Sequence, residues 1–446
     1  MGYIEKKKYS KTIRILGALA CGALVGACAD NSYPGADEFL KSGLVVENSK
    51  VPILISVGRS STSIDGRSRA GEDLASATDD KKNETKWNEP YIYVYAFHRT
   101  KTDDYTLTPG NGEDQICLVD NSLSTQGSLL GKEAQISTGS PYAAWTNSPL
   151  SIFYPINSEP YNFFSYYLDE MNVTNQDVVR TPENISLKID LENWRTNKKE
   201  RPVGMADLMY ARAAESGLID QIFANGTYTD EEKQNIQKYS FSGYTAQRGI
   251  QPTLQFHHAM ARFKFEIEGK YQLDEGLQPY IYKIKVLDVP KQVLFTVAGN
   301  NPSAFGIYPQ ENSSYISEIF LHDYDPETGV YSELPDPETG ANAYCDKIPN
   351  DNAYTQVGSY LILPANVQSY RCEIWMKQKI NGEWKADKAD VILQKADGQP
   401  IEQGLDYTVK MDVYGWQEMK VKIDVGAWKV GGWAEIDPDK EFTEKK

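Results

Sequence analysis

The sequence is poor in the residues from which most catalytic and metal sites are built. Its 446 residues include only five Cys and four His. It also lacks a glycine-rich phosphate-binding loop, a serine nucleophile motif, a His-Glu zinc motif and a paired Cys and His. We therefore predict no catalytic residue, no bound metal and no cofactor. This pattern favours a binding or structural protein over an enzyme.

The four His are not arranged to bind one metal together. His98 closes an expected strand, and His322 lies beside an acidic loop. His257 and His258 are neighbours in an expected strand, so their side chains point to opposite faces of the sheet. We interpret all four as structural or solvated residues.

The acidic loop has only part of a calcium-binding pattern. Asp323, Asp325 and Glu327 have the alternate spacing of such a loop. However, Gly329 comes one position late, and Leu334 stands where a bidentate Glu is required. We interpret the segment as a solvated turn and keep a calcium site at Asp323 as the alternative.

The scarce Cys exclude a disulfide scaffold. Without the two N-terminal Cys considered below, the chain keeps Cys117, Cys345 and Cys372, an odd number. Cys345 and Cys372 flank an expected strand at residues 359–363. They either pair in an oxidising compartment or remain as two buried thiols.

Basic residues are outnumbered by acidic ones, and this imbalance excludes several partners. The net charge is −16, and residues 1–27 hold five basic residues and one acid, so the rest of the chain is near −20. An acidic surface repels nucleic acid and anionic lipid head groups. We therefore expect no nucleic-acid partner.

The N-terminal apolar run is too short for a permanent membrane helix. It covers 13 residues, Ile15–Ala27, and follows a segment rich in Lys. This length and charge pattern is typical of a signal peptide. The run ends in Leu24-Val25-Gly26-Ala27-Cys28, which resembles the bacterial lipobox. We predict a signal peptide over residues 1–27 and lipidation, as palmitate, of Cys28; Cys21 is disfavoured because the bulky Leu19 lies close before it.

Helical periodicity is almost absent, whereas strand patterns are frequent. The chain has 29 Tyr and 8 Trp, residues that suit strands. Alternation and turn signals predict an all-β fold with two antiparallel β-sandwich domains. The expected strands are 50–58, 91–97, 151–154, 161–168, 253–268, 280–289, 292–298, 359–363, 371–378, 390–394, 407–414 and 420–428.

Turn-rich segments suggest how the chain is divided. Residues 28–49 are polar and predict a tether, and interruptions over 240–252 predict a boundary between domains at 50–245 and 246–446. The Thr229–Glu232 segment has the form of a capping box, which predicts a short surface helix to about Lys238.

Several motifs along the chain together resemble a known family. The lipobox and tether are followed by Lys50–Gly58 and then by a loop that contains Arg67–Leu74. Further motifs lie at Tyr161–Tyr167, Asp207–Ala211, Phe256–Phe265, Tyr360–Pro364 and Ile423–Trp428. Their order resembles the fimbrillins, the lipoprotein pilins of the type V pili of anaerobic Gram-negative bacteria.

This resemblance implies two transthyretin-like β-sandwich domains in tandem and a pilus subunit that supports adhesion. It implies export as a lipoprotein to the outer membrane, cleavage by an Arg-specific protease, and polymerisation with other pilus subunits by donor-strand exchange. An Arg-Ala site and a C-terminal strand favour a shaft or tip subunit over the anchor, which keeps its lipid.

The family's cleavage site has the form Arg-Ala, which Arg69 and Ala70 match. Arg59, Arg67 and Arg69 lie in a loop of Ser, Gly and Asp that a protease can draw into an extended form. A cut after Arg69 would release the lipid, the tether and the strand at 50–58 together.

Loss of the strand at 50–58 would uncover apolar core and open sheet edges, which another strand can fill. The donor that we predict is the segment 419–433, where Val421, Ile423 and Val425 alternate with polar residues. The alternative is that Lys420–Trp428 is the last strand of its own sandwich.

A surface lipoprotein that binds glycans through aromatic residues is the alternative function. Trp145, Trp194, Trp384 and Trp433 lie in polar surroundings and could stack on sugar rings. Packing within the protein is favoured for the first three, and both roles stay open for Trp433.

Overall fold

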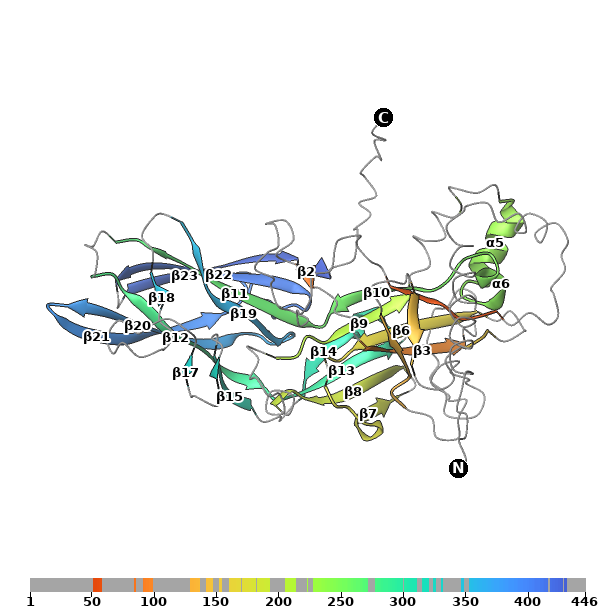
Figure 1. The fold of residues 1–446 in the computed structure, drawn as a ribbon, viewed down its shortest axis with the longest axis horizontal. Helices are drawn as coiled ribbons and strands as arrows, with labels where there is room; N and C mark the ends of the chain where they lie inside the picture. Colours follow the sequence, from red (N-terminus) through yellow and green to blue (C-terminus); the bar gives the residue numbers. More distant parts are fainter. Residues whose placement is uncertain are drawn as a thin grey trace, which may run out of the picture. The chain divides into compact units, whose positions relative to one another are not determined.

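The structure is a computed structural model of the chain. It describes residues 51–57, 84–85, 91–98, 129–136, 142–146, 152–154, 160–169, 171–181, 183–192, 205–213, 223, 228–271, 277–299, 301–310, 315–320, 324–325, 330–331, 346–348, 353–415, 418–427 and 429–430. Most of this part of the chain is β-strand in several mainly antiparallel sheets, which confirms the all-β prediction (Figure 1).

Seven strands form one closed sheet. In order they are β1 (Ile55–Val57), β10 (Thr253–His258), β9 (Met209–Ala213), β6 (Tyr161–Tyr167), β3 (Tyr91–His98), β4 (Lys132–Gln135) and β5 (Tyr142–Trp145). β5 pairs back onto β1 and closes the sheet. Within it, β1 and β10 are parallel and the other pairs are antiparallel.

A four-stranded sheet packs against this closed sheet. It has the order β14 (Gly306–Pro309), β13 (Gln292–Gly299), β8 (Asn184–Asp190) and β7 (Val178–Arg180). Tyr166 of β6 meets Phe295 of β13 edge to face, with ring centroids 6.4 Å apart. Such edge-to-face pairs are a favoured aromatic geometry, so these two rings join the sheets.

β6 is buried on both faces, which explains its run of aromatic residues. Phe164 and Tyr166 belong to the core shared with β8 and β13, whereas Phe163 and Tyr167 belong to the core inside the closed sheet. A strand covered on both faces needs apolar residues at successive positions rather than at alternate ones.

The remaining large sheets form a second sandwich. One sheet has the order β19 (Thr355–Pro364), β11 (Met260–Gly269), β22 (Leu405–Gly415) and β23 (Glu418–Ala427). The other has the order β15 (Tyr315–Phe320), β12 (Tyr280–Pro290), β20 (Tyr370–Ile380) and β21 (Glu383–Leu393), and β18 (Asp346–Lys347) also pairs with β12. Buried side chains of β11, β22, β12 and β20 belong to one core.

Smaller elements complete the described chain. Two further pairs are β16 (Tyr324–Asp325) with β17 (Val330–Tyr331), and β2 (Glu84–Thr85) with β24 (Lys429–Val430). The 3₁₀ helices are η2 (Asn175–Asp177) and η3 (Pro302–Ala304), and the α-helices are α5 (Asp230–Lys238) and α6 (Gly243–Ala246). Among the described residues, the helices are all too short or too polar to cross a membrane.

The expected helix at residue 229 is confirmed. The Thr229 side chain accepts a hydrogen bond from the Glu232 amide, and the Glu232 carboxylate accepts one from the Thr229 amide. This reciprocal capping satisfies two amide groups that would otherwise lack partners at the start of α5.

The expected strand at 253–268 is two strands in different sheets. β10 ends at His258, β11 begins at Met260, and the amide of Ala259 between them donates to the Leu208 carbonyl at 2.7 Å. Both halves alternate with period two, so the local pattern does not reveal the break.

Strands on either side of residue 245 pair with each other. β13 pairs with β8, and β10 pairs with both β9 and β1. The domain boundary at residues 245 and 246 therefore stays a prediction, and chain beyond it contributes strands to the sheets built by the earlier part of the chain.

Candidate functional site: the first strand and its neighbours

The first described segment, residues 51–57, contributes a strand to the closed sheet, and its aliphatic side chains point into the core that the sheet encloses. Ile53, Ile55 and Val57 are 1%, 0% and 4% exposed, and Val51 packs against the same cluster. The intervening Pro52 is exposed, and Leu54 and Ser56 are half-buried. The expected alternation of core-facing aliphatic residues is therefore present.

Backbone hydrogen bonds hold this segment along both edges. Ser56 donates to the Pro252 carbonyl at 2.9 Å on the β10 side. On the other side, Ile53 donates to the Ile152 carbonyl at 2.8 Å, and Tyr154 donates to the Val51 carbonyl at 2.9 Å. The expected strand at 151–154 is reduced to a single bridge between Pro52 and Phe153. Loss of the segment would leave unpaired backbone groups on two sides of a gap.

Trp145 fixes the segment with a side chain. Its indole Nε1 donates to the Ile53 carbonyl at 3.1 Å, and the residue is only 8% exposed. Trp145 packs within the protein, as the sequence analysis favours, because its ring lies in the core beside β1; the alternative role of Trp145 as a surface for sugars does not fit this position.

Aromatic rings line the core that the segment covers. Phe163 packs edge to face on Phe241 and on Tyr154, with ring centroids 6.1 and 6.3 Å apart. The Tyr154 hydroxyl is buried and has no hydrogen-bond partner among the described residues, and burial raises the pKa of Tyr154. A strand that replaced β1 would meet an apolar, aromatic surface.

Burial of the three aliphatic side chains is a large stabilising contribution. At about 1.5–3 kcal/mol for each fully buried side chain, Ile53, Ile55 and Val57 together contribute roughly 5–9 kcal/mol. This is an upper value because an unfolded chain already buries part of its apolar surface. It is comparable to the whole stability of a typical domain, about 5–15 kcal/mol.

The predicted donor segment lies in β23, the edge strand of the second sandwich. β23 pairs with β22 from Met419 to Ala427, and Val421 and Ile423 pack half-buried against the adjacent core. Val425 is 47% exposed. In the intact chain, residues 419–427 therefore form the last strand of their own sandwich, which is the alternative given in the sequence analysis.

Charged side chains line the outer face of β23. Asp424 lies 2.8 Å from the Lys410 ammonium of β22 and 2.7 Å from the Lys422 ammonium. Hydrogen bonds from Lys410 and then Lys422 lower the pKa of Asp424 to about 2. These ion pairs tie β23 to β22 along its solvent-facing side.

Most other sequence predictions about sites fall outside the described residues. They concern Cys28, Arg69, Ala70, Cys345, Trp194, Trp433 and the side chains of the acidic loop at Asp323. Cys372 is described, and it is a buried free thiol whose pKa burial raises. Trp384 is half-buried and packs edge to face on Tyr280.

The paired His residues do point to opposite faces. His257 is exposed, whereas His258 is buried and its Nδ1 lies 2.8 Å from the Asp207 carboxylate. Among the described residues, no group of three or more His, Cys, Asp or Glu side chains is placed to hold a metal ion.

Solved structures resemble this chain over most of its length. A fimbrial protein from Bacteroides vulgatus is 12% identical, with a TM-score of 0.48, over 85% of this chain and 99% of that one. A candidate cell adhesion protein from Bacteroides uniformis is 14% identical, with a TM-score of 0.41, over 85% and 99%. The fimbrial anchor protein Mfa2 from Porphyromonas gingivalis is 8% identical, with a TM-score of 0.27, over 86% and 100%.

These descriptions agree with the fimbrillin resemblance of the sequence. No protein-family model matches the chain, and a search of curated proteins gives no match. The identities and TM-scores of all three structures are low.

Proposed function

We propose that the chain is a shaft or tip subunit of a cell-surface pilus, and that its first strand is exchanged for a strand of the next subunit. The observation that carries this proposal is the position of residues 51–57. They belong to a closed sheet, they are bonded on both edges, and they precede Arg69 and Ala70 in the sequence.

The order of segments makes this strand removable. Arg69 and Ala70 follow it in the sequence, so a cut between them separates β1 from the rest of the chain. After the cut, only hydrogen bonds and apolar contacts retain β1. A strand with a similar alternation of aliphatic residues can then displace it, because it makes equivalent backbone bonds and buries a similar apolar area.

Lipidation at Cys28 places the uncut chain at the outer membrane. The lipid and β1 lie on the same side of the cleavage site, so one cut both frees the subunit from the membrane and makes β1 exchangeable. A subunit therefore becomes competent to polymerise only when it leaves its anchor.

The proposal is tested by treating the full chain with an Arg-specific protease. The new N-terminus should read Ala-Gly-Glu-Asp-Leu, and electron microscopy should show filaments that an Arg69→Gln variant does not form. An Arg59→Gln variant is the matched control and should assemble normally. A new N-terminus at Ser60 or Ser68 would assign the cleavage to Arg59 or Arg67 in place of Arg69. Cleaved protein that stays monomeric would contradict the proposal.

A further inference from the structure

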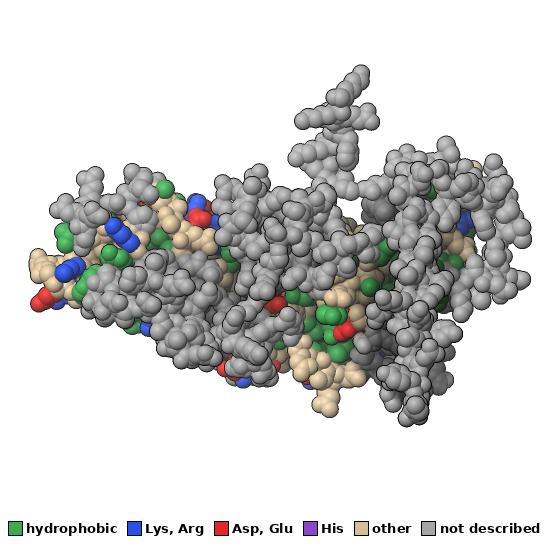
Figure 2. All heavy atoms as spheres, viewed as in Figure 1, with side chains coloured by type: hydrophobic (Ala, Val, Ile, Leu, Met, Phe, Trp, Pro, Cys, Tyr) green, Lys and Arg blue, Asp and Glu red, His purple; other side chains and the backbone are tan. Residues whose placement is uncertain are grey.

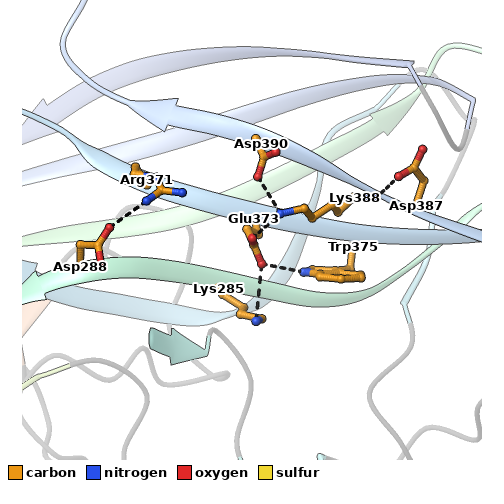
Figure 3. Close-up of polar contacts among 8 residues, drawn as sticks. All are labelled: Lys285, Asp288, Arg371, Glu373, Trp375, Asp387, Lys388 and Asp390. Carbon is orange, nitrogen blue, oxygen red and sulfur yellow. Dashed lines mark hydrogen bonds and ion pairs between the residues drawn. The ribbon is translucent and has the colours of Figure 1, made fainter. Parts of the chain in front are cut away.

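On the outward face of β12, β20 and β21, the Trp375 ring lies among basic side chains, of which Figure 3 shows Lys285 and Lys388. Trp375 of β20 lies between Lys283 of β12 and Lys388 of β21, its partners in the two strand ladders. The ammonium of Lys283 lies 5.1 Å from the Trp375 ring centroid, and that of Lys388 lies 5.8 Å from it. Both distances permit cation–π attraction.

A second aromatic group lies further along the same strands. The Lys377 ammonium is 5.4 Å from the Tyr282 ring and 5.5 Å from the Trp384 ring. Trp384 in turn meets Tyr280 edge to face at 5.9 Å. Trp375, Trp384, Tyr280 and Tyr282 are each only half-buried. Neighbouring rings that follow one another along these strands suit an extended ligand.

This face carries a net positive charge, whereas the whole chain is negatively charged. This face carries three acidic residues, Asp288, Glu373 and Asp390, and six basic ones, which are Lys283, Lys285, Arg371, Lys379, Lys388 and the buried Lys377. The whole chain has a net charge of −16. In Figure 2, Lys and Arg side chains lie beside hydrophobic ones at the end of the molecule where Figure 1 labels β20 and β21.

The acidic residues leave part of this positive charge unpaired. Glu373 bonds Lys388 and lies 3.5 Å from Lys285, and Asp288 pairs with Arg371 at 3.1 Å. Among the described residues, none has a carboxylate within ion-pair distance of Lys283 or Lys379. These two ammonium groups can turn to an external anion without breaking an ion pair.

We propose that this face binds an acidic polysaccharide. The C–H surface of a pyranose ring packs on the negative face of an aromatic ring. The carboxylate or sulfate groups of the same polysaccharide would pair with Lys283, which lies over the Trp375 ring, and with Lys379. One ligand thus supplies an apolar surface that packs on the rings and negative charge that pairs with the lysines.

Two other kinds of partner fit this face less well. Protein interfaces are enriched in aromatic residues and Arg but depleted in Lys, whereas five of these six basic residues are Lys. Double-stranded DNA carries about one charge per 1.7 Å, so an acidic chain repels it strongly. A polysaccharide with one charge per sugar is a sparser polyanion, which the local positive face can hold.

The test measures binding of the full, uncleaved chain to polygalacturonate by affinity gel electrophoresis at low salt. The matched ligand control is the methyl ester of the same polymer, which keeps the sugar rings and loses the charge. The variants are Trp375→Ala and the double variant Lys283→Gln with Lys379→Gln. The matched protein controls are Lys188→Gln and Tyr91→Ala, which change an exposed Lys on β8 and an exposed Tyr on β3.

We expect polygalacturonate to retard the protein and its methyl ester to leave the mobility unchanged. The double Lys variant should weaken binding by about tenfold, the effect of losing two exposed ion pairs, and Trp375→Ala should also weaken it. Equal weakening by Lys188→Gln, or equal binding of the ester, would overturn the proposal. Tighter binding of single-stranded oligothymidine would assign the face to nucleic acid instead. Because binding is measured without assembly, the outcome is independent of the proposed pilus function.

Discussion

Ile55 has a completely buried side chain in the segment proposed to be exchanged. Ile53, Ile55 and Val57 together bury a large apolar area, although β1 contributes only three residues to the regular ladder. Alternation in the sequence identified these side chains as core residues. The partners of the strand could not be identified in the same way, because Pro252 and Ile152 are far from it in the sequence.

We predict that Ile55→Ala lowers the free energy of unfolding of the intact chain by about 2–5 kcal/mol, because it removes buried methyl groups and leaves a cavity. Chemical denaturation followed by tryptophan fluorescence measures this change. Ser56→Ala, on the half-buried face of the same strand, should change the free energy by less than about 0.5 kcal/mol. Equal effects of the two substitutions would contradict the assigned orientation of the strand.

Tyr154 offers a second test at the residue scale. Its buried hydroxyl has no hydrogen-bond partner in the described part of the chain, so Tyr154→Phe should leave the free energy of unfolding unchanged or raise it by about 1 kcal/mol. The matched control is Tyr166→Phe, because the Tyr166 hydroxyl donates to the Leu130 carbonyl. The control should lower the free energy by about 0.5–1.5 kcal/mol. A larger loss in Tyr154→Phe than in the control would show that Tyr154 has a partner.

Among the elements, many strands with clear alternation were predicted from the sequence, whereas the pairing of strands into sheets was not. The aromatic strand β6 was expected, but its burial on both faces depends on β13, which comes more than 100 residues later. β8 was overlooked although Ile185, Leu187 and Ile189 alternate in it. Local patterns indicate where strands form, whereas pairing depends on contacts between distant parts of the chain.

β23 combines an ordinary edge position with a feature expected of a donor strand. Val425 is 47% exposed in the intact chain, so its substitution should have little effect on folding. We predict that Val425→Asp keeps the thermal unfolding midpoint within about 2 °C but abolishes polymerisation after cleavage, because a donor strand must bury this position. Lys422→Gln on the other face is the control and should polymerise normally. Normal filaments of Val425→Asp would exclude this register of donor strand.

The outer face of β23 also predicts a dependence on pH. Lys410 and Lys422 lower the pKa of Asp424 from 3.8 to about 2 in the folded chain. A carboxylate with a lowered folded-state pKa stabilises the fold above its unfolded pKa, and this stabilisation is lost as the pH falls from about 4 to 2. Asp424→Asn should therefore make stability less dependent on pH in this range. Denaturant midpoints at several pH values measure it, with Glu183→Gln as control; an unchanged slope would contradict the assignment.

At the scale of the whole molecule, the described chain joins a closed sheet, a flanking four-stranded sheet and a second sandwich. β1, the strand proposed to leave, and β23, the strand proposed to replace β1 of a neighbouring subunit, lie in different sheets of one chain. A subunit that gives up the first and offers the second can link to neighbours on two sides. Repetition of this contact generates an open polymer rather than a closed oligomer when the rotation between subunits does not close a ring.

The central claim is that polymerisation replaces β1. The direct measurement is the amount of the β1-containing fragment released from Arg-cleaved protein, followed by mass spectrometry while filaments form. The account predicts that the fragment stays bound to cleaved monomers and is released in step with assembly, close to one fragment for each subunit joined. Filaments that form while every subunit retains its fragment would contradict it.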